Sequence, residues 1–254
     1  MSRDIAEMKN QTREVIQALW IGKTLSVMER LSISSFLTHG HEYHLYVYED
    51  IQDLPKGIIV KNANEIIPSD RIFKYPQHES FSGFSNLFRY KLLLERGGYW
   101  ADTDVVCLRR FDFSKHYVFA EEEITETEKR ICGNIIKTPP GSEIMKFCYE
   151  TSIAKNPDLL NWGETGPDLL TPAVEKFSLS SNVCSYWTFN PVNWWHWEDF
   201  VQDGLAARLR LRWRLLRRPH GIHLWNEMWR RNGAGKNQRY PSKSLYERLK
   251  RKYL

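Results

Sequence analysis

The chain has 254 residues, of which 42% are hydrophobic and 26% are charged, and these proportions exclude a wholly disordered chain and a body embedded in a membrane. The length allows one sizeable core, so we predict a single domain over residues 1–254. The net charge of +5 comes from basic residues concentrated at 208–218 and 248–252, a pattern that fits attraction to anionic lipid at least as well as attraction to nucleic acid.

The first fifty residues predict the opening of a parallel α/β sheet. An apolar run over 15–21 indicates a buried strand. A helix should follow, beginning with the capping-box spacing of Ser26 and Glu29 and ending at Gly40. A strand at 43–48, rich in aromatic and β-branched residues, comes next. Strand, helix and strand in this order predict parallel strands joined by a right-handed crossover.

The following residues extend this pattern to an acidic pair. Residues 58–60 could form a further strand, and a helix over 84–96 should end at the two glycines that follow it. A strand at 99–101 then delivers Asp102 at its end. Ligands in open α/β sheets collect beyond the carboxyl ends of strands, so Asp102 stands where a site is expected.

Asp102 and Asp104 form an Asp-Thr-Asp triplet. Two carboxylates one residue apart at a strand end can hold Mg²⁺ or Mn²⁺, which prefer oxygen ligands and accept substrate phosphates as further ligands. In sugar transfer such a cation would neutralise the charge that develops on a departing nucleoside diphosphate. Alone, the triplet fits a solvated acidic turn equally well, because this pattern occurs often by chance.

The longer segment FSNLFRYKLLLERGGYWADTDVV, at 84–106, resembles the DXD-containing sugar transferases of glycosyltransferase family 32. That family includes α-1,4-galactosyl- and α-1,4-N-acetylglucosaminyltransferases and many bacterial surface-polysaccharide enzymes. Three further segments agree with it: ALWIG at 18–22, TGPDLLT at 165–171 and HLWN at 223–226. The resemblance covers most of the chain and implies a GT-A fold, a nucleotide-sugar donor, Mn²⁺ or Mg²⁺, and retention of anomeric configuration.

Pattern and resemblance together predict an α/β fold of the GT-A type, with a Rossmann-like, mostly parallel sheet and a smaller C-terminal appendage of helices and loops. Within the single domain we expect residues 14–110 to form the nucleotide-sugar-binding half and 111–235 the acceptor half. Residues 236–254 would form a basic C-terminal tail.

The resemblance implies two donor-binding residues on the helix before the triplet, Asn86 and Arg89. They lie three residues apart, so both side chains can point the same way. The family's arginine here contacts the donor, and a guanidinium suits phosphate or sugar oxygens, although position alone favours an exposed helical arginine. The family usually has Ser-Asp where this chain has Ser85-Asn86, and the loss of that charge leaves the donor sugar open.

His223 is implied as a third metal ligand beside Asp102 and Asp104, because its surroundings match the family's late His-x-Trp-Asn motif. One isolated histidine among eight would otherwise be a weak candidate. Neutral imidazole suits Mn²⁺ better than Mg²⁺, so Mn²⁺ is the preferred ion.

Two further residues each have two interpretations. Trp20 could stack on the uracil of a UDP-sugar, or it could be an ordinary core residue. Asp168, in the Gly-Pro-Asp sequence, could contact the acceptor or donor sugar as a catalytic carboxylate beside Asp104, or it could cap the next helix. Of the three glutamates at 121–123, at most one would face the site, because alternate residues of a strand point apart.

Two unusual segments carry no site assignment. The aromatic cluster of Trp187, Trp194, Trp195 and Trp197 could offer platforms to an acceptor sugar, but ordinary packing explains it better. Leucine and arginine nearly alternate over 205–218; alternation favours a strand, whereas both residue types favour a helix, so its structure stays open. Its charge could hold the protein near an anionic membrane that bears a lipid-linked acceptor.

We therefore expect an enzyme, a glycosyltransferase that moves a hexose or N-acetylhexosamine from a UDP-sugar to a saccharide or lipid-linked saccharide. The alternative is an inactive carbohydrate- or nucleotide-binding protein of the same fold. A nucleic-acid-binding protein is disfavoured because no recognition element is present. Four dispersed cysteines indicate reduced, mostly buried thiols. Because the sequence shows no signal peptide and no membrane-spanning segment, we expect a cytoplasmic protein that could bind at the inner face of the cell membrane.

Overall fold

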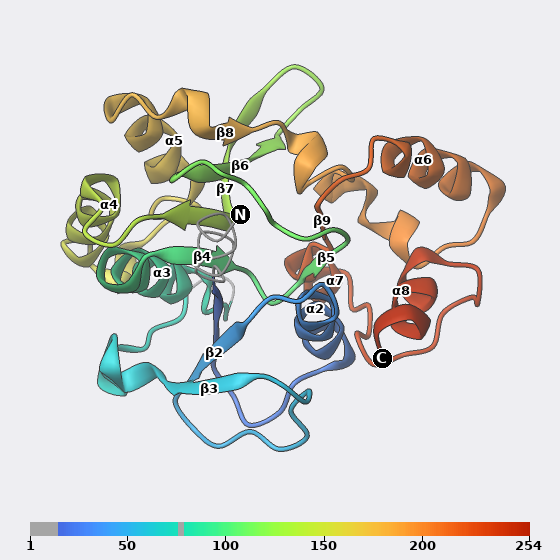
Figure 1. The fold of residues 1–254 in the computed structure, drawn as a ribbon, viewed down its shortest axis with the longest axis horizontal. Helices are drawn as coiled ribbons and strands as arrows, with labels where there is room; N and C mark the ends of the chain where they lie inside the picture. The colour runs from blue at the N-terminus through green and yellow to red at the C-terminus, as the bar shows by residue number, and fades with distance from the viewer. Residues whose placement is uncertain (1–14, 76–78) are drawn as a thin grey trace, which may run out of the picture.

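The structure, a computed structural model, describes residues 15–75 and 79–254 (Figure 1). Residues 1–14, in which no signal peptide is expected, lie outside the described residues. A seven-stranded sheet has the order β3-β2-β1-β4-β7-β6-β8, and β5 and β9 form a separate two-stranded ribbon. The strands are β1 (Ile16–Trp20), β2 (Tyr43–Val47), β3 (Ile59–Asn62), β4 (Gly98–Ala101), β5 (Val105–Cys107), β6 (Val118–Glu123), β7 (Lys129–Thr138), β8 (Val183–Cys184) and β9 (Gly221–His223).

Helices lie between and after these strands. The α-helices of the described residues are α2 (Val27–Thr38), α3 (Ser82–Arg96), α4 (Glu143–Ile153), α5 (Pro167–Lys176), α6 (Leu205–Leu216), α7 (Asn226–Arg231) and α8 (Leu245–Tyr253). Short 3₁₀ helices are η1 (Ala63–Glu65), η2 (Ser69–Arg71), η3 (Pro157–Leu159), η4 (Ser180–Asn182), η5 (Tyr186–Thr188) and η6 (Trp194–Phe200).

The expected strand-helix-strand opening is confirmed, since β1 pairs in parallel with β2 and α2 connects them. The capping box is present at the start of α2. The Ser26 hydroxyl accepts from the Met28 N–H at 3.2 Å, and the Ser26 N–H donates to Glu29 Oε2 at 2.6 Å. Gly40 follows the helix with a φ of 76°, in the left-handed region that glycine adopts without strain.

The sheet is mostly parallel. The pairings of β1 with β2 and β4, of β2 with β3, and of β6 with β8 are parallel, whereas both pairings of β7 are antiparallel. The helices after β8 form a smaller group beside the sheet (Figure 1). The predicted α/β class, with a mostly parallel sheet and a C-terminal appendage, is therefore confirmed.

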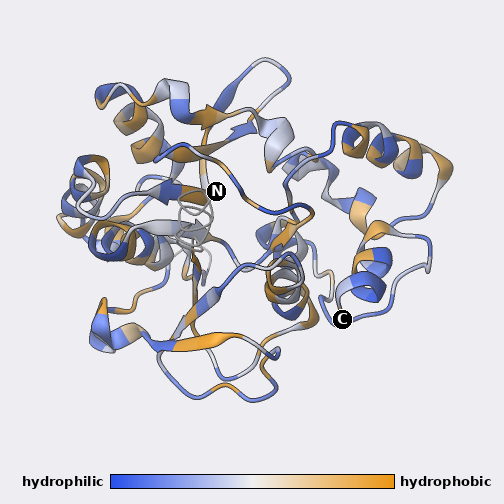
Figure 2. Ribbon diagram, viewed as in Figure 1, coloured by the Kyte–Doolittle hydropathy of each residue, from blue (hydrophilic) through white to orange (hydrophobic). Residues whose placement is uncertain are grey.

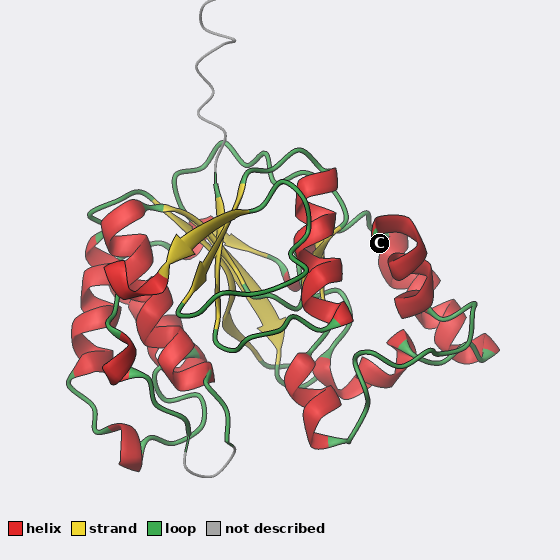
Figure 3. Ribbon diagram, turned by 90° about the horizontal axis from the view of Figure 1, so that it is seen from below, coloured by secondary structure: helices red, strands yellow, loops and turns green. Residues whose placement is uncertain are grey.

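The sheet separates two hydrophobic layers because successive side chains of a strand point to opposite faces. On β4, Trp100 packs in the layer formed with α3, α4 and α5, whereas Tyr99 and Ala101 pack in the opposite layer with α2. Hydrophobic residues accordingly follow the strands and one side of these helices (Figure 2), and the sheet lies between the two helical layers (Figure 3). A third cluster joins α2 to η6 and α8.

The Arg-rich segment, which the sequence leaves open between strand and helix, is helical and forms α6. Two of its arginines face the protein. Arg210 donates from Nε to Asp199 Oδ2 at 2.8 Å, and Arg214 donates to the carbonyl of Pro191 at 2.5 Å. Arginines therefore occur on the inward side of α6 as well as on its exposed side, because Arg210 and Arg214 bind neighbouring parts of the appendage.

All four cysteines are unpaired, and Cys107, Cys132 and Cys148 are buried, as expected. Burial raises the pKa of the Cys107 and Cys148 thiols to about 12, which keeps both thiols protonated and unreactive at neutral pH. Within residues 15–75 and 79–254, no helix is both long and apolar enough to cross a membrane.

Gly97 ends α3 in a conformation and a space that only glycine fits, and this provides a test of the fold. Its φ is 63°, and a Cβ there would lie 2.5 Å from the backbone nitrogen of Pro140. Gly141 also has a positive φ, of 73°, but no atom lies within 4 Å of its Cβ position. We predict that Gly97→Ala lowers the free energy of unfolding by at least about 2 kcal/mol more than Gly141→Ala, because only the former adds a backbone clash to the conformational cost. Equal midpoints in urea denaturation would contradict this view of the α3–β4 turn.

Candidate active site

A cavity of about 590 Å³ opens at the carboxyl ends of β1 and β4. Trp20 lines it from the end of β1, Asp102 and Asp104 from the turn after β4, and Asn86 and Arg89 from α3. His223 reaches the same cavity from the end of β9. The cavity therefore brings together six residues that the sequence predicts for the site: Trp20, Asn86, Arg89, Asp102, Asp104 and His223.

Strand pairing brings His223 to the acidic turn although the two are 119 residues apart. β5 and β9 are antiparallel, with Val105 opposite His223, and the Leu224 N–H donates to the Asp104 carbonyl at 2.9 Å. His223 Nε2 consequently lies 3.1 Å from Asp104 Oδ2. One ligand atom from each of Asp102, Asp104 and His223 lies within 4.8 Å of the others.

Asp102 is fixed by two donors. Arg89 Nη2 donates to its Oδ1 at 2.8 Å, and Trp100 Nε1 donates to the same oxygen at 2.7 Å. Arg89 also lies over the Trp100 ring, 5.0 Å from the ring centroid. Gly133 makes this placement possible, since a Cβ there would lie 2.0 Å from Arg89 Nη1. Arg89 is 5% exposed, so the interpretation of Arg89 as an exposed helical arginine is wrong.

Asp104 is fixed from the side of β9. The Asn226 N–H donates to Asp104 Oδ2 at 2.8 Å, next to the His223 contact. This N–H is aimed at the carboxylate because Trp225 adopts a left-handed conformation, with a φ of 57°. The Trp225 indole donates to the Val192 carbonyl at 2.7 Å and lies against the His223 ring, with the ring centroids 4.0 Å apart. Strain of this kind in a non-glycine residue is typical of functional sites.

The two carboxylates have different electrostatic environments. Burial raises the pKa of Asp102, and the neighbouring Asp104 adds to this rise while Arg89 opposes it. Burial would also raise the pKa of Asp104, but the charge and hydrogen bond of His223 and the Asn226 N–H outweigh it, so the pKa of Asp104 lies below its ordinary value. Burial would lower the pKa of His223, yet the Asp104 carboxylate raises it overall.

The three side chains fit a divalent cation. Neighbouring ligands on an octahedral ion at about 2.1 Å lie about 3.0 Å apart, which matches the 3.1 Å between His223 Nε2 and Asp104 Oδ2. Carboxylate oxygens with one imidazole suit Mn²⁺. His223 Nε2 now faces a carboxylate oxygen and must be free of its proton before it can bind a cation.

Of the Gly-Pro-Asp sequence at 166–168, Pro167 lines the cavity, whereas Asp168 is not among the lining residues. Asn86 Nδ2 donates to Thr165 Oγ1 at 3.4 Å, and a Cβ on Gly166 would lie 2.9 Å from the same nitrogen, so α3 and this segment are closely packed. Asp168 lies in the first turn of α5 and its carboxylate is 3.7 Å from Arg130 Nη1. The N-cap of α5 is Gly166, so the interpretation of Asp168 as the capping residue is wrong.

Trp20 is only half-buried. Its indole N–H donates to the Thr24 carbonyl at 3.1 Å. Its ring lines the cavity and also packs against the edge of the hydrophobic core. A wholly buried core position is therefore excluded. The stacking role stays a prediction.

The cavity also contains an ion pair between Glu122 and Arg130, and only Glu122 is among the residues that the sequence suggests for the site. Glu122 lines the cavity, is 3% exposed and accepts from Arg130 Nε at 2.6 Å. The alternation of side chains along a strand predicts that at most one of the three glutamates at 121–123 faces the site. Of the three, Glu122 lines the cavity. Its pairing with Arg130 depends on the β6–β7 register, which no local pattern reveals.

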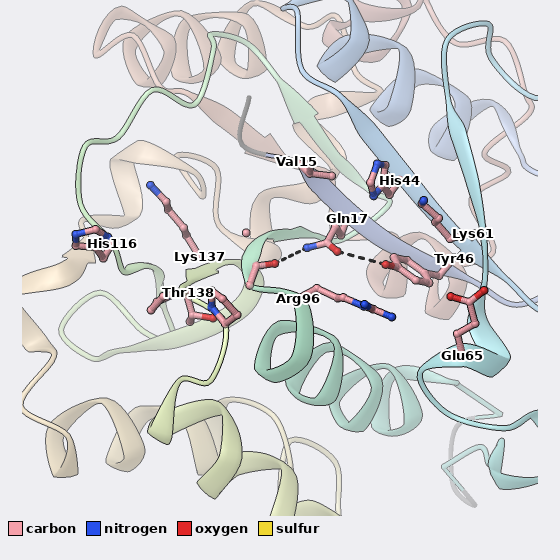
Figure 4. A pocket seen from close by; sticks show the side chains of 14 residues that line it. Val15, Gln17, His44, Tyr46, Lys61, Glu65, Arg96, His116, Lys137 and Thr138 are labelled. Atoms are coloured by element: carbon pink, nitrogen blue, oxygen red, sulfur yellow. Dashed lines mark hydrogen bonds between the residues drawn. The ribbon is translucent and has the colours of Figure 1, made fainter. Parts of the chain in front are cut away.

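A second cavity, of about 600 Å³, lies at the amino ends of β1 and β4, beside Val15 and Gln17 (Figure 4). Lys61, Arg96 and Lys137 bring positive charge to its lining. Gln17 there donates to the Gly97 carbonyl at 2.6 Å and accepts from the Tyr46 hydroxyl at 3.5 Å, contacts that hold the α3–β4 turn. The cluster of metal-ligand type found in the described residues lies in the first cavity, so we assign the chemistry to that one.

Two protein-family models match the chain. Residues 25–129 match a glycosyltransferase sugar-binding region containing the DXD motif, and residues 137–253 match an alpha 1,4-glycosyltransferase conserved region. The first range holds Asp102 and Asp104, and the second holds Asp168 and His223. No curated protein matches the chain.

Several solved structures are similar. The PaToxG glycosyltransferase has a TM-score of 0.50 at 14% identity, over 99% of this chain and 93% of that chain. GlyE of Streptococcus pneumoniae TIGR4 has a TM-score of 0.43 at 14% identity, over 84% of this chain and 55% of that chain. Galactosyltransferase LgtC, in complex with donor and acceptor sugar analogs, has a TM-score of 0.42 at 11% identity, over 89% and 97%. The likeness to PaToxG concerns the fold alone, and it confirms the expected GT-A fold.

The contacts of His223 generate a prediction about metal affinity. We expect His223→Ala to weaken Mn²⁺ binding at least about tenfold, because it removes one of three ligands. His220→Ala is the matched control, since His220 is half-buried on the same segment but hydrogen-bonds the Arg110 carbonyl outside the cavity. Isothermal calorimetry with MnCl₂ measures both. An unaltered affinity in His223→Ala would remove His223 from the ligand set.

Proposed function

Because the chain belongs to the glycosyltransferases with a DXD sugar-binding region, we propose that it transfers a hexose or N-acetylhexosamine from a UDP-sugar to a saccharide acceptor, with the help of Mn²⁺. The observation that carries the proposal is the convergence of Asp102, Asp104 and His223 in one cavity with Arg89 beside them. The cavity volume of about 590 Å³ lies within the range usual for sites that enclose small molecules.

Asp102, Asp104 and His223 would hold the cation, and the cation would supply charge neutralisation for the departing nucleoside diphosphate. Arg89 would bind an oxygen of the sugar donor. Its Nε is buried and has no hydrogen-bond partner among the described residues, whereas its Nη2 is held by Asp102. A buried donor left unpaired is costly, and a phosphate or sugar oxygen of the donor would satisfy it.

The donor would lie between β1 and α3. Trp20, whose indole N–H is already engaged by the Thr24 carbonyl, offers its ring to a uracil, and Asn86 offers an amide to sugar hydroxyls. Asp168, whose side chain is 57% exposed beside Arg130, would contact an acceptor or donor sugar with its free carboxylate oxygen.

We infer retention of configuration from the class of linkage. A UDP-hexose carries its sugar in an α linkage, and the family model that matches residues 137–253 belongs to transferases that form α-1,4 linkages. An α-linked donor and an α-linked product require retention at the anomeric carbon. The acceptor is a saccharide or a lipid-linked saccharide, and the arginines at 208–218 favour peripheral association with an anionic membrane.

A donor screen tests the proposal directly. We expect release of UDP from one UDP-sugar in the presence of Mn²⁺, and a much slower release after chelation, because the leaving pyrophosphate would lose its counter-charge. No UDP release from any common UDP-sugar, with or without saccharide acceptors, would favour an inactive binding protein of the same fold.

Asp104→Asn separates charge from structure in that assay. Asparagine can keep an oxygen for the Asn226 N–H, but it removes the charge that holds the cation. We expect turnover to fall at least about a hundredfold, which corresponds to a loss of roughly 3 kcal/mol in transition-state stabilisation. Asp158→Asn, on exposed η3, is the control and should retain full turnover. Near-normal turnover of Asp104→Asn under Mn²⁺ would refute the metal assignment.

Trp20→Ala tests the stacking role. Stacking on a base holds ground state and transition state alike, so we expect the KM for the donor to rise about tenfold or more while kcat changes little. Steady-state kinetics with the donor identified in the screen measures both constants. An unchanged KM together with a large loss of thermal stability would identify Trp20 as a packing residue.

A further inference from the structure

Helix α6 presents its apolar side to solvent. Four of its large hydrophobic side chains are exposed: Leu205 by 71%, Leu209 by 55%, Trp213 by 53% and Leu216 by 69%. At about 100° per residue these positions fall within about 80° of one another around the helix axis, so they form one stripe. Helices of globular proteins normally turn such a stripe inward, and an outward stripe marks an interaction surface.

The inward side of α6 is fastened mainly by charge. Arg210 pairs with the buried carboxylate of Asp199, and Arg214 donates to the Pro191 carbonyl and, at 3.5 Å, to Asn193 Oδ1. Ala207 and Leu211 are the buried apolar residues of this helix. Since these contacts fix the rotation of α6, the stripe is held outward by the structure of the appendage.

Arginines border the stripe. Arg208 and Arg212 are exposed, follow one edge of it and have no acidic partner among the described residues, and α6 itself contains no Asp or Glu. At the other edge, Arg217 lies over the rings of Trp187 and Trp213, with distances to the centroids of 4.0 Å and 5.3 Å. α6 lies at the periphery of the molecule, where hydrophobic and hydrophilic colours alternate along it (Figures 1 and 2).

We propose that α6 is a membrane-docking helix that lies in the plane of an anionic bilayer surface, with its leucines and Trp213 in the interface and its bordering arginines on lipid phosphates. Leucine and tryptophan on one side with arginines at its edges are the composition of interfacial helices. Two copies of α6 packed on each other would bring unpaired arginines together, so charge favours a lipid surface over a second copy of this chain. The docking goes beyond sugar transfer and can be measured without it.

α6 is coupled to the wall of the catalytic cavity. The residues that Arg214 holds directly precede η6, which begins at Trp194, and Trp194 lines the cavity. A docked α6 would therefore fix the position of the cavity relative to the bilayer surface. This arrangement suits an acceptor saccharide that is presented on a lipid.

Vesicle sedimentation of the full chain tests the proposal. We expect binding to vesicles of phosphatidylcholine with about 30% phosphatidylglycerol, and at least tenfold weaker binding to phosphatidylcholine alone. The double variant Leu209→Ser, Trp213→Ser should bind the anionic vesicles at least tenfold more weakly, and so should Arg208→Gln, Arg212→Gln. Matched controls are Ile153→Ser, Leu159→Ser, two exposed apolar residues elsewhere, and Arg248→Gln, Arg251→Gln on α8; both should bind like the parent.

Insertion is distinguished from adsorption by bromine-labelled acyl chains. These lipids should quench tryptophan fluorescence of the parent protein, and Trp213→Phe should lose most of this quenching. Vesicle binding that the stripe variants retain would overturn the proposal. So would a dimer in light scattering that the stripe variants abolish, because the stripe would then be a contact between copies.

The readout is separate from the proposed function. The stripe variants should release UDP from donor in solution at the parental rate, since α6 contributes no residue to the cavity lining. Loss of vesicle binding with normal UDP release therefore concerns α6 alone, whereas normal vesicle binding without UDP release would contradict the transferase proposal and leave the docking intact.

Discussion

Two carboxylates that share one turn in a cavity wall repel each other, and the surroundings of Asp102 and Asp104 compensate this repulsion. Each carboxylate has its own compensation. Asp102 is paired with Arg89 and Asp104 with His223, and backbone and indole N–H groups add hydrogen bonds to both. These partners come from α3, β4, β9 and the first residue of α7, so four elements meet at the charge of a single turn.

The need to balance these two negative charges explains two features of the backbone that are costly in themselves. Gly133 on β7 leaves space for the Arg89 guanidinium, and left-handed Trp225 turns the Asn226 N–H toward Asp104. Both features cost conformational freedom or strain in the folded chain. A cation bound between the carboxylates would replace the His223 proton as the source of positive charge, and the same geometry would then serve the ion. The site is thus arranged for positive charge between the two carboxylates, and Arg89 and His223 supply part of that charge.

Much of this arrangement follows from local sequence. The opening strand, α2 with its capping box, α3 and the short strand before the acidic triplet are all marked by periodicity, caps or glycines, and each lies within a few residues of its predicted place. The approach of His223 to Asp104 is different, because the β5–β9 ribbon joins residues more than a hundred positions apart. No local pattern encodes that contact, and the family motif around His223 was the signal available for it. The pairing of Glu122 with Arg130 had no such signal.

The orientation of α6 shows a second limit. Its sequence places leucines and arginines around a helix, but which side meets the protein depends on the position of Asp199 and of the Pro191 carbonyl, which belong to another part of the appendage. Hydrophobicity alone would turn the leucines inward. The Asp199 side chain is buried, so a rotation of α6 that removed Arg210 would leave this carboxylate unpaired, and that cost can set the rotation of the helix against the tendency. The contacts that leave four large apolar side chains in solvent also join α6 to Asn193, the neighbour of Trp194 in the cavity wall, and so connect a surface helix with the active site.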